Sequence, residues 1–334
     1  MSLPTDDGFF MPAEWSPHKR CWMAWPCRTE LWGEGLDAAR AAYTEVAKAI
    51  ADFEPVTMVA NGEEIAEVSL RCGSGVACLP LAHDDSWMRD NGPTFVIDGK
   101  GGLAGVDWRF NAWGDEYDNY ENDAAVAGAI LAHLDVPAYM APMVLEGGSI
   151  HVDGEGTLLT TEQCLLNPNR NPKLSQAQIE ENLRAYLGVR RIIWLGRGLE
   201  DDETDGHVDN LACFVRPGVV LALSTDDPDD GNYTALQDNL ARLRAADLEV
   251  IEVPQPAPRT GKDGRRLALS YINFYMANGG VVMPSFEDAK DEEAFTTVSN
   301  CFPDRKVLQI PVLDIVCGGG GIHCITQQQP AMED

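Results

Sequence analysis

Apolar residues recur at intervals of three and four in several segments of the chain, and this spacing predicts amphipathic helices. In the first segment, Leu36 and Tyr43 fall on the same helical face. In the third, Ser175 and Gln178 fit a capping box, and the helix should end before Gly188. The predicted helices cover approximately residues 36–53, 123–134, 175–187, 235–246 and 288–299.

Short runs rich in β-branched and other apolar residues lie between these helices and predict strands. The runs cover residues 56–60, 76–80, 94–97, 157–160, 192–195, 211–215, 219–223, 248–253, 281–284 and 307–310. Because strands outnumber helices, a TIM barrel, which needs one helix for each strand, fits poorly. The last four helices recur roughly every 50 to 60 residues, which predicts about five repeated units of several strands and one helix. No Pro/Ser-rich linker divides the chain, so we expect one α/β domain over residues 1–334.

The composition is typical of a globular protein without a membrane span. Hydrophobic residues make up 45% and charged residues 23% of the chain. No apolar run reaches the length of about 18 residues that a membrane-spanning helix needs. Residues 1–10 lack the positive region and the following apolar region of a secretory signal, so the expected location is the cytoplasm.

The chain is strongly acidic, with a net charge of −28 from 53 acidic and 25 basic residues. A nucleic-acid partner is therefore not expected, because phosphate contacts need a basic face. A cationic small molecule would be attracted, although a soluble, self-repelling surface accounts for most of this charge. The nine cysteines are scattered and include no CxxC pair, which argues against a disulfide scaffold or a structural zinc site.

The most informative segment is the run of four glycines, Gly318 to Gly321, that precedes His323 and Cys324. Such a run costs backbone entropy, and its use is a positive φ or close approach of the backbone to something flat or bulky. The Lys and Ser/Thr of a phosphate-binding loop are missing. A thiol beside a run of backbone N–H groups can have a lowered pKa, which makes Cys324 a candidate nucleophile. The alternative is a flexible turn before a buried cysteine.

A second candidate lies in the acidic segment 201–210, where a single residue separates His207 from Asp209. In an extended strand the two side chains would project from the same face. An imidazole beside a carboxylate can act as a general acid or base, and the carboxylate favours the imidazolium form. Taken alone, the segment fits an exposed acidic loop with a solvated histidine better.

Two further segments add carboxylates. Asp90 follows Trp87 in a turn-rich segment directly before a predicted strand, and could present its carboxylate to a planar cation. Glu146 follows apolar residues and precedes two glycines, which suggests a buried acid. Since a buried Glu is rare unless it is paired, His207 would be a sensible partner.

Together these four segments resemble the catalytic constellation of the guanidino-group-modifying superfamily. Members of that superfamily have a five-bladed α/β-propeller fold of repeated ββαβ-type units with pseudo-fivefold symmetry. Segments 11–18, 22–26, 204–210 and 322–328 are similar to its agmatine deiminase branch. Bacterial peptidyl-arginine deiminases are similar over much of the same length. Asn91 departs from the expected Thr but lies beside Asp90 rather than replacing it.

The resemblance implies a covalent mechanism that needs no metal and no organic cofactor. Cys324 would attack the guanidino carbon as a thiolate, while His207 would protonate the departing ammonia and then activate water. Glu146 would orient His207 and keep it cationic. Asp90 and Asp209 would bind the N–H edges of the guanidinium. Agmatine would yield N-carbamoylputrescine and ammonia, a step in putrescine and polyamine synthesis.

The expected partner is thus a small cationic guanidino substrate, with Trp87, Asp202 and Glu203 as additional binding residues. The alternative substrates are peptidyl-arginine and free arginine, handled by the same machinery. The resemblance is also compatible with a homo-oligomer, although the sequence itself does not indicate one.

Two other classes of function are open to the sequence alone. His207, Asp209 and His323 formally match an iron site of two histidines and one carboxylate, but that reading leaves Glu146 and Cys324 unexplained. A polyamine-binding protein could use acids and its eight tryptophans as a cation cage, but it gives no reason for the glycine-framed cysteine. The enzyme interpretation assigns no role to His323.

Overall fold

The strands form five separate sheets in the computed structural model, which describes residues 2–332. The sheet that joins the two ends of the chain contains, in order, β16 (Gln327–Pro330), β1 (His18–Ala24), β2 (Val56–Ala60) and β3 (Val76–Pro80). The second contains β4 (Thr94–Ile97), β5 (Leu103–Arg109) and β6 (Ala138–Val144), and the third β7 (His151–Val152), β8 (Thr157–Thr161) and β9 (Arg191–Leu195). The fourth contains β10 (Ala212–Arg216), β11 (Val219–Ser224) and β12 (Glu249–Pro254), and the fifth β13 (Tyr275–Ala277), β14 (Gly280–Ser285) and β15 (Lys306–Pro311).

Each three-stranded sheet repeats one pattern of connections. The first strand pairs antiparallel with the second, and the second pairs parallel with the third. A parallel pair needs a long crossover, and a helix supplies it in each sheet. These helices are α6 (Asp123–Leu134), α8 (Gln176–Leu187), α9 (Tyr233–Ala245) and α10 (Asp291–Cys301).

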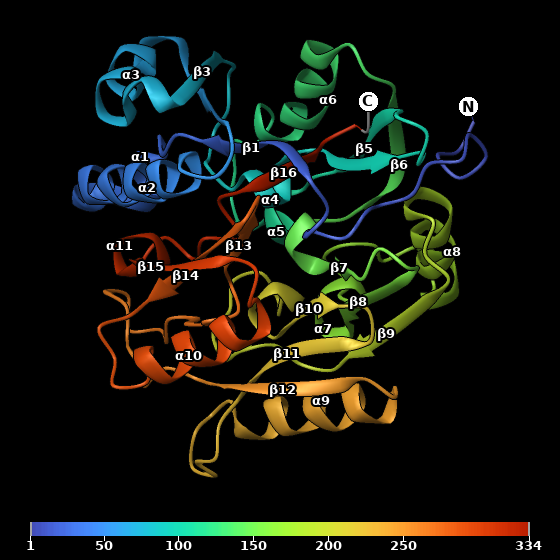
Figure 1. The fold of residues 1–334 in the computed structure, drawn as a ribbon, viewed down its shortest axis with the longest axis vertical. Helices are drawn as coiled ribbons and strands as arrows, with labels where there is room; N and C mark the ends of the chain where they lie inside the picture. Colours follow the sequence, from blue (N-terminus) through green and yellow to red (C-terminus); the bar gives the residue numbers. More distant parts are fainter. Residues whose placement is uncertain (1, 333–334) are drawn as a thin grey trace.

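The first sheet builds the same unit from both ends of the chain. The C-terminal strand β16 pairs antiparallel with β1, and β1 pairs parallel with β2 through α2 (Leu36–Ala51). A further crossover through α3 (Ile65–Cys72) then adds β3, again parallel. Figure 1 shows the five sheets grouped around a common centre with these helices on the outside. The short helices α4 (Met88–Asn91) and α5 (Ala112–Asp115) lie near the middle.

The helical period identified the five long crossover helices to within a few residues. The capping box at α8 is present, with the Gln178 amide N–H donating to Ser175 Oγ and the Ser175 N–H donating to Gln178 Oε1. The ten predicted strands also form, whereas α3, β1, β5, β6, β7, β13 and β16 were not predicted. Helix α10 begins three residues later than expected, because Asp288 instead closes a turn by accepting the backbone N–H of Asp291.

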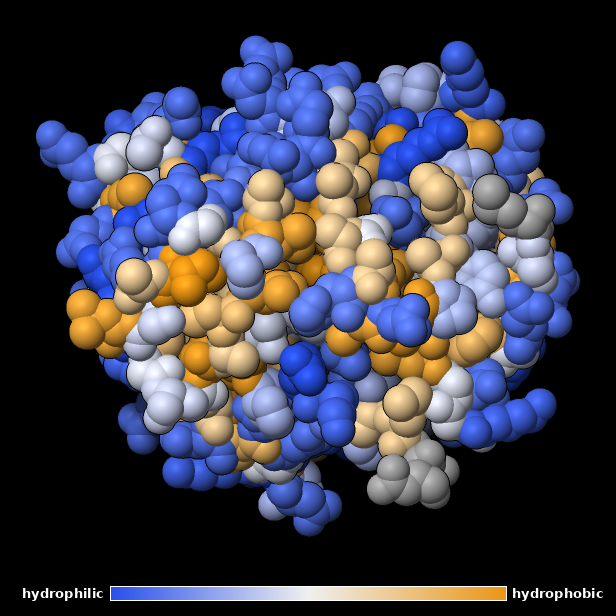
Figure 2. All heavy atoms as spheres, turned by 90° about the horizontal axis from the view of Figure 1, so that it is seen from above, coloured by the Kyte–Doolittle hydropathy of each residue, from blue (hydrophilic) through white to orange (hydrophobic). Residues whose placement is uncertain are grey.

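Within residues 2–332 we find no helix that is both long and apolar enough to cross a membrane. The face of the molecule in Figure 2 is hydrophilic along its margins and carries apolar residues across its middle. Large exposed apolar side chains in the described chain include Leu70 of α3 and Met140 of β6. Apolar atoms contribute more than half of the accessible surface of an ordinary globular protein, so these residues alone do not define a binding site.

Candidate active site

The candidate catalytic residues occupy equivalent places in four of the five sheets, each in the segment that leads into the sheet's first strand. Asp90 lies in α4 ahead of β4, Glu146 ahead of β7, His207 and Asp209 ahead of β10, and Cys324 ahead of β16. In the fifth sheet the equivalent segment carries Asn273, two residues ahead of β13. The repeated topology therefore delivers one set of polar side chains from each sheet to a shared centre.

Gly148 marks the point where these side chains converge. A carbon added there would lie 2.6 Å from His207 Nδ1 and 2.9 Å from Asp209 Oδ2. It would also lie 3.0 Å from Asp90 Oδ1, which accepts the Gly148 N–H at 2.9 Å. Any larger residue would therefore push the site apart, which explains a glycine at this position.

Asp90 is buried and held from two sides. Its Oδ2 accepts the indole N–H of Trp113 at 2.9 Å, and its Oδ1 lies 3.9 Å from His207 Nδ1. Burial and the nearby Asp209 raise the pKa of Asp90, and the cationic His207 only partly offsets them. An added cation would therefore be favoured beside this carboxylate.

His207 and Glu146 form a fully buried pair, with Nε2 and Oε2 3.7 Å apart. Burial opposes the charged form of His207, but Asp90, Cys164 and Glu146 outweigh it and raise the pKa of His207 well above its usual value. Glu146 Oε1 accepts the Nε–H of the buried Arg170 at 2.7 Å. Despite burial, Arg170 and His207 lower the pKa of Glu146 to about 2. His207 is therefore an imidazolium held over an ionised carboxylate.

The expectation that His207 and Asp209 share one face of a strand is wrong. His207 precedes a short 3₁₀ turn, Val208–Asn210, so Asp209 turns toward a different set of partners. Asp209 Oδ2 accepts Nδ1–H of His323 at 2.9 Å and lies 3.5 Å from Cys324 Sγ. The two residues still meet around Gly148, but through the turn rather than along a strand.

His323, which has no role in the interpretation of the sequence, is a buried link between two carboxylates. Its Nδ1 contacts Asp209, and its Nε2 lies 2.9 Å from Glu14 Oε1. Burial and Arg89 oppose protonation, yet Glu14 and Asp209 raise the pKa of His323. In spite of burial, His323 and His207 keep the pKa of Asp209 low. His323 therefore positions Asp209 and keeps it ionised.

Cys324 is buried, and Asn273 holds it in place. The Asn273 amide nitrogen donates to Sγ at 3.2 Å, while its oxygen accepts the backbone N–H of His323 at 2.9 Å and that of Cys324 at 3.4 Å. Burial, Asp209 and Asp90 raise the pKa of Cys324 well above its usual value. The expected lowering of the thiol pKa is therefore wrong, because burial and the two carboxylates outweigh the backbone N–H of Gly321.

The glycine run serves the close approach that the sequence suggested. A side chain at Gly318 would collide with the ring of Trp32, and one at Gly320 would collide with the ring of Trp87. These two indoles stack on each other with centroids 5.9 Å apart. The glycines therefore let the backbone beside Cys324 lie against flat aromatic surfaces, and Gly319 takes a φ of 107°.

A narrow pocket opens on Cys324. Its lining includes aromatic, acidic and glycine residues: Trp87, Asp90, Trp113, Glu116, Tyr117, Glu203, Thr204, Gly318, Gly319, Gly320 and Cys324. Tyr117, Glu203 and Gly319 also line an outer cavity of about 440 Å³, so the pocket adjoins a wider entrance.

Asp202 and Glu203, the two acids expected to bind the tail of the substrate, have different surroundings. Glu203 lines the pocket, where Oε2 accepts the hydroxyl of Tyr117 at 3.2 Å and Oε1 pairs with Arg265 at 2.6 Å. Asp202 does not line it. The Asp202 carboxylate instead accepts the backbone N–H and the hydroxyl of Thr204, at 3.0 and 2.7 Å. These hydrogen bonds stabilise the loop that carries both residues.

Trp113 lies in a strained segment that the sequence did not single out. Residues 112–115 all have positive φ, with Trp113 at 57°. Side chains other than glycine adopt this conformation rarely, and it recurs at functional sites. Here it turns the indole N–H onto Asp90 and the ring into the pocket.

Comparison with known proteins agrees with this geometry. Residues 10–330 match the family described as Porphyromonas-type peptidyl-arginine deiminase. The chain belongs to this family. Within it, an agmatine deiminase of Pseudomonas aeruginosa is 50% identical, and the match covers 99% of this chain and 98% of that protein. A solved agmatine deiminase of Enterococcus faecalis superposes with a TM-score of 0.95 at 39% identity, covering 99% of this chain and 98% of that one.

Another relative, the agmatine deiminase of Stutzerimonas stutzeri, is 49% identical over 99% of this chain and 98% of its own length. The likeness therefore extends over the whole α/β fold, including every segment that carries a candidate catalytic residue. A putative peptidyl-arginine deiminase of known structure also superposes, with a TM-score of 0.89 at 30% identity. Relatives named for agmatine and relatives named for peptidyl-arginine therefore share this fold.

Proposed function

We propose that this protein hydrolyses agmatine to N-carbamoylputrescine and ammonia, as a C–N hydrolase acting on a linear amidine. The observation that carries the proposal is the position of Cys324. Its thiol lines a pocket with Asp90 and lies 3.5 Å from Asp209. Both carboxylates converge with His207 around Gly148. The full-length likeness to agmatine deiminases supports the same substrate.

Binding of the guanidinium prepares the nucleophile. Asp90 and Asp209 raise the pKa of the buried Cys324 thiol, and a bound cation neutralises that effect. The thiol then loses its proton to solvent, and the Asn273 amide N–H supports the thiolate. The same two carboxylates accept the guanidinium N–H groups and hold the carbon above Sγ.

Two chemical steps follow. The Cys324 thiolate adds to the guanidino carbon, and the C–N bond to the terminal nitrogen breaks as His207 gives that nitrogen a proton, releasing ammonia. The neutral His207 next takes a proton from water. The resulting hydroxide adds to the amidino carbon. As the C–S bond breaks, the hydroxyl proton passes to the departing sulfur, which restores the Cys324 thiol and releases the neutral ureido product. Glu146 stays ionised throughout and keeps His207 oriented.

The five sheets support a finer description of the fold. Each sheet repeats the ββαβ order, and each sends one polar segment to the same centre. We infer a five-bladed α/β-propeller with pseudo-fivefold symmetry and a single catalytic domain over residues 1–334. A cytoplasmic location, a homo-oligomeric assembly and a place in putrescine synthesis remain predictions.

The decisive experiment measures the ureido product from agmatine, free arginine and a blocked arginine peptide. We expect a kcat/KM for agmatine about a hundredfold or more above that for arginine, because the arginine α-carboxylate would meet the acidic pocket. Turnover of the blocked peptide at the agmatine rate would instead favour a peptidyl-arginine deiminase. Equal use of arginine and agmatine would contradict the substrate assignment.

Glu203→Gln is expected to lower kcat/KM for agmatine about tenfold or more and to narrow its advantage over arginine. Glu203 is the acid that links the pocket to the entrance, and its partner Arg265 is half exposed and can swing aside. Asp202→Asn is the matched control, because Asp202 contacts its own loop. If the ratio of the two kcat/KM values is unchanged in Glu203→Gln, Glu203 does not bind the substrate amine.

Asn273→Asp is expected to slow alkylation of Cys324 by iodoacetamide at a fixed pH, measured on the Cys324 peptide by mass spectrometry. The replacement keeps an oxygen for the N–H groups of His323 and Cys324 but exchanges the donor at Sγ for a negative charge. A further rise in the pKa of Cys324 follows. If Asn273 only braced the backbone, the aspartate would preserve the wild-type alkylation rate.

A further inference from the structure

Three side chains outside the active site converge at the ends of three neighbouring strands. Cys27 follows β1, Glu64 follows β2, and His83 follows β3, each by three or four residues. These strands are adjacent and parallel, so their carboxyl ends share one edge of the sheet. Side chains that follow these strands are therefore brought close together.

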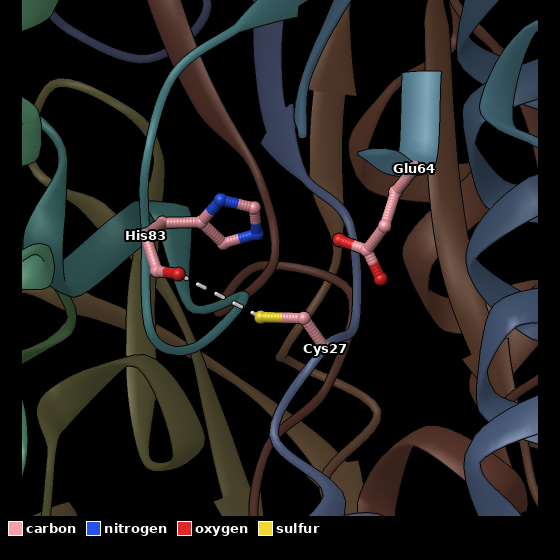
Figure 3. A group of neighbouring side chains, drawn as sticks. All are labelled: Cys27, Glu64 and His83. Atoms are coloured by element: carbon pink, nitrogen blue, oxygen red, sulfur yellow. Dashed lines mark hydrogen bonds between the residues drawn. The ribbon is translucent and has the colours of Figure 1, made fainter. Parts of the chain in front are cut away.

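Figure 3 shows the Cys27 thiol, the Glu64 carboxylate and the His83 ring facing a common space. One ligand-type atom from each lies within 4.8 Å of the other two. Thiolate, imidazole and carboxylate are the three ligand types that Zn²⁺ takes in proteins. Three protein ligands plus one further donor complete its tetrahedral shell.

The contacts of His83 are compatible with a metal ion on its ring. The ring is buried, with Nε2 2.8 Å from the carbonyl oxygen of Trp25 and Nδ1 3.2 Å from that of Leu81. A neutral imidazole carries a single N–H, so it can donate to only one of these oxygens and turns a lone pair on the other. A metal ion on Nε2 removes the conflict, because Nδ1–H then donates to Leu81 and fixes the tautomer.

The other contacts of Glu64 leave one of its carboxylate oxygens available to a metal ion. Glu64 Oε1 pairs with Arg40, but Oε2 has only a 3.4 Å contact from Asn61. Arg40 keeps a second partner in Glu67 at 2.8 Å if Glu64 turns toward an ion. The Asn61 side chain also donates to the carbonyl oxygen of His83 and accepts the His83 backbone N–H, at 3.3 Å each. These bonds connect two of the segments that carry the ligands.

The surroundings of Cys27 also suit a cation. The thiol lies 3.4 Å from the carbonyl oxygen of Asp84, whereas the carboxylates of Asp85 and Asp123 already pair with Arg28. On coordination the thiol proton passes to solvent and Sγ bonds to the metal.

We propose that Cys27, Glu64 and His83 bind one Zn²⁺ ion, with the Trp25 carbonyl oxygen or a water as the fourth donor. The ion takes no part in the hydrolysis, since none of its ligands lines the pocket of Cys324. It braces the loops after three strands, including residues 83–85 just ahead of Trp87 and Asp90.

The test is calorimetric titration of Zn²⁺ into protein stripped with EDTA and dialysed, on the Cys324→Ala background so that the active-site thiol cannot bind. We expect one Zn²⁺ per chain and a rise in Tm of several degrees. Cys27→Ser should weaken binding by more than about a hundredfold, since even outer-shell changes cost 10–100-fold. Co²⁺ should give a sulfur-to-metal absorption band that is lost in the same variant.

Glu64→Gln provides a second variant at a part-exposed position and should also weaken Zn²⁺ binding. Two controls should leave it unchanged: Cys317→Ser removes an exposed thiol, and Cys164→Ala removes the thiol that lies with Glu146 and His207. Absence of stoichiometric binding by the unmodified site would overturn the proposal. Binding that survives Cys27→Ser, or that disappears with Cys164→Ala, would overturn it as well.

Discussion

Replacing Cys324 with alanine is expected to reduce turnover of agmatine by about four powers of ten or more, while the substrate still binds. The replacement removes the only atom that forms the covalent bond. The carboxylates of Asp90 and Asp209 stay in place, held by Trp113 and His323. The guanidinium therefore keeps its partners and loses only its nucleophile. Turnover is measured as ureido product, and binding by calorimetry.

Cys317→Ala is the matched control for this loss. Cys317 lies seven residues earlier in the same glycine-rich segment, but it is exposed and lines the outer cavity rather than the pocket of Cys324. It should turn over agmatine at the wild-type rate. Activity of Cys324→Ala within about tenfold of wild type would mean that the reaction is not covalent at this residue.

The periodic parts of the fold could be predicted from the sequence, and the polar strands could not. The long crossover helices carry a clear helical period. In contrast, β16 is Gln327 to Pro330, three glutamines that look like a surface tail but are buried. Two of their amides find partners far away in the sequence: Gln329 accepts the indole N–H of Trp22 at 3.0 Å, and Gln327 donates to the carbonyl of Pro93 at 2.7 Å. Such partners come together only when the chain folds.

Some residues of the candidate site could be predicted from the sequence, and others could not. The neighbouring glycines drew attention to Cys324 and Glu146, and a buried Glu is rare unless it is paired. His207 became a candidate only when the four segments were taken together. Asn273 and Trp113 are ordinary residues in ordinary contexts, and only the fold reveals their contacts with the site. One signal was available: each unit places its polar residues just ahead of its first strand, and Asn273 occupies that place in the fifth.

Two expectations were wrong for electrostatic and conformational reasons. The glycines before Cys324 suggested a lowered thiol pKa, but burial and the carboxylates of Asp209 and Asp90 raise it. His207 and Asp209 were placed on one strand face, whereas Asn210 and its neighbours close a 3₁₀ turn.

His207→Gln is expected to stall the reaction and to change the pH dependence of whatever activity remains. In the free wild-type enzyme, kcat/KM should rise with pH as Cys324 loses its proton and fall as His207 loses its own. Both groups have raised pKa values, so the optimum should lie on the alkaline side of neutrality. Glutamine cannot donate a proton to ammonia or take one from water. In His207→Gln the fall of kcat/KM at alkaline pH should therefore vanish, whereas the rise that reports Cys324 should remain.

Glu146→Gln distinguishes this proton transfer from a merely structural role of His207. The change keeps the shape of the side chain but removes one of the charges that raise the pKa of His207. A raised pKa means that imidazolium persists to higher pH, so removing its cause should move the falling limb of the wild-type profile to lower pH. The rising limb, set by Cys324, should move much less. If the falling limb keeps its position in Glu146→Gln, or survives in His207→Gln, then a group other than His207 supplies the proton.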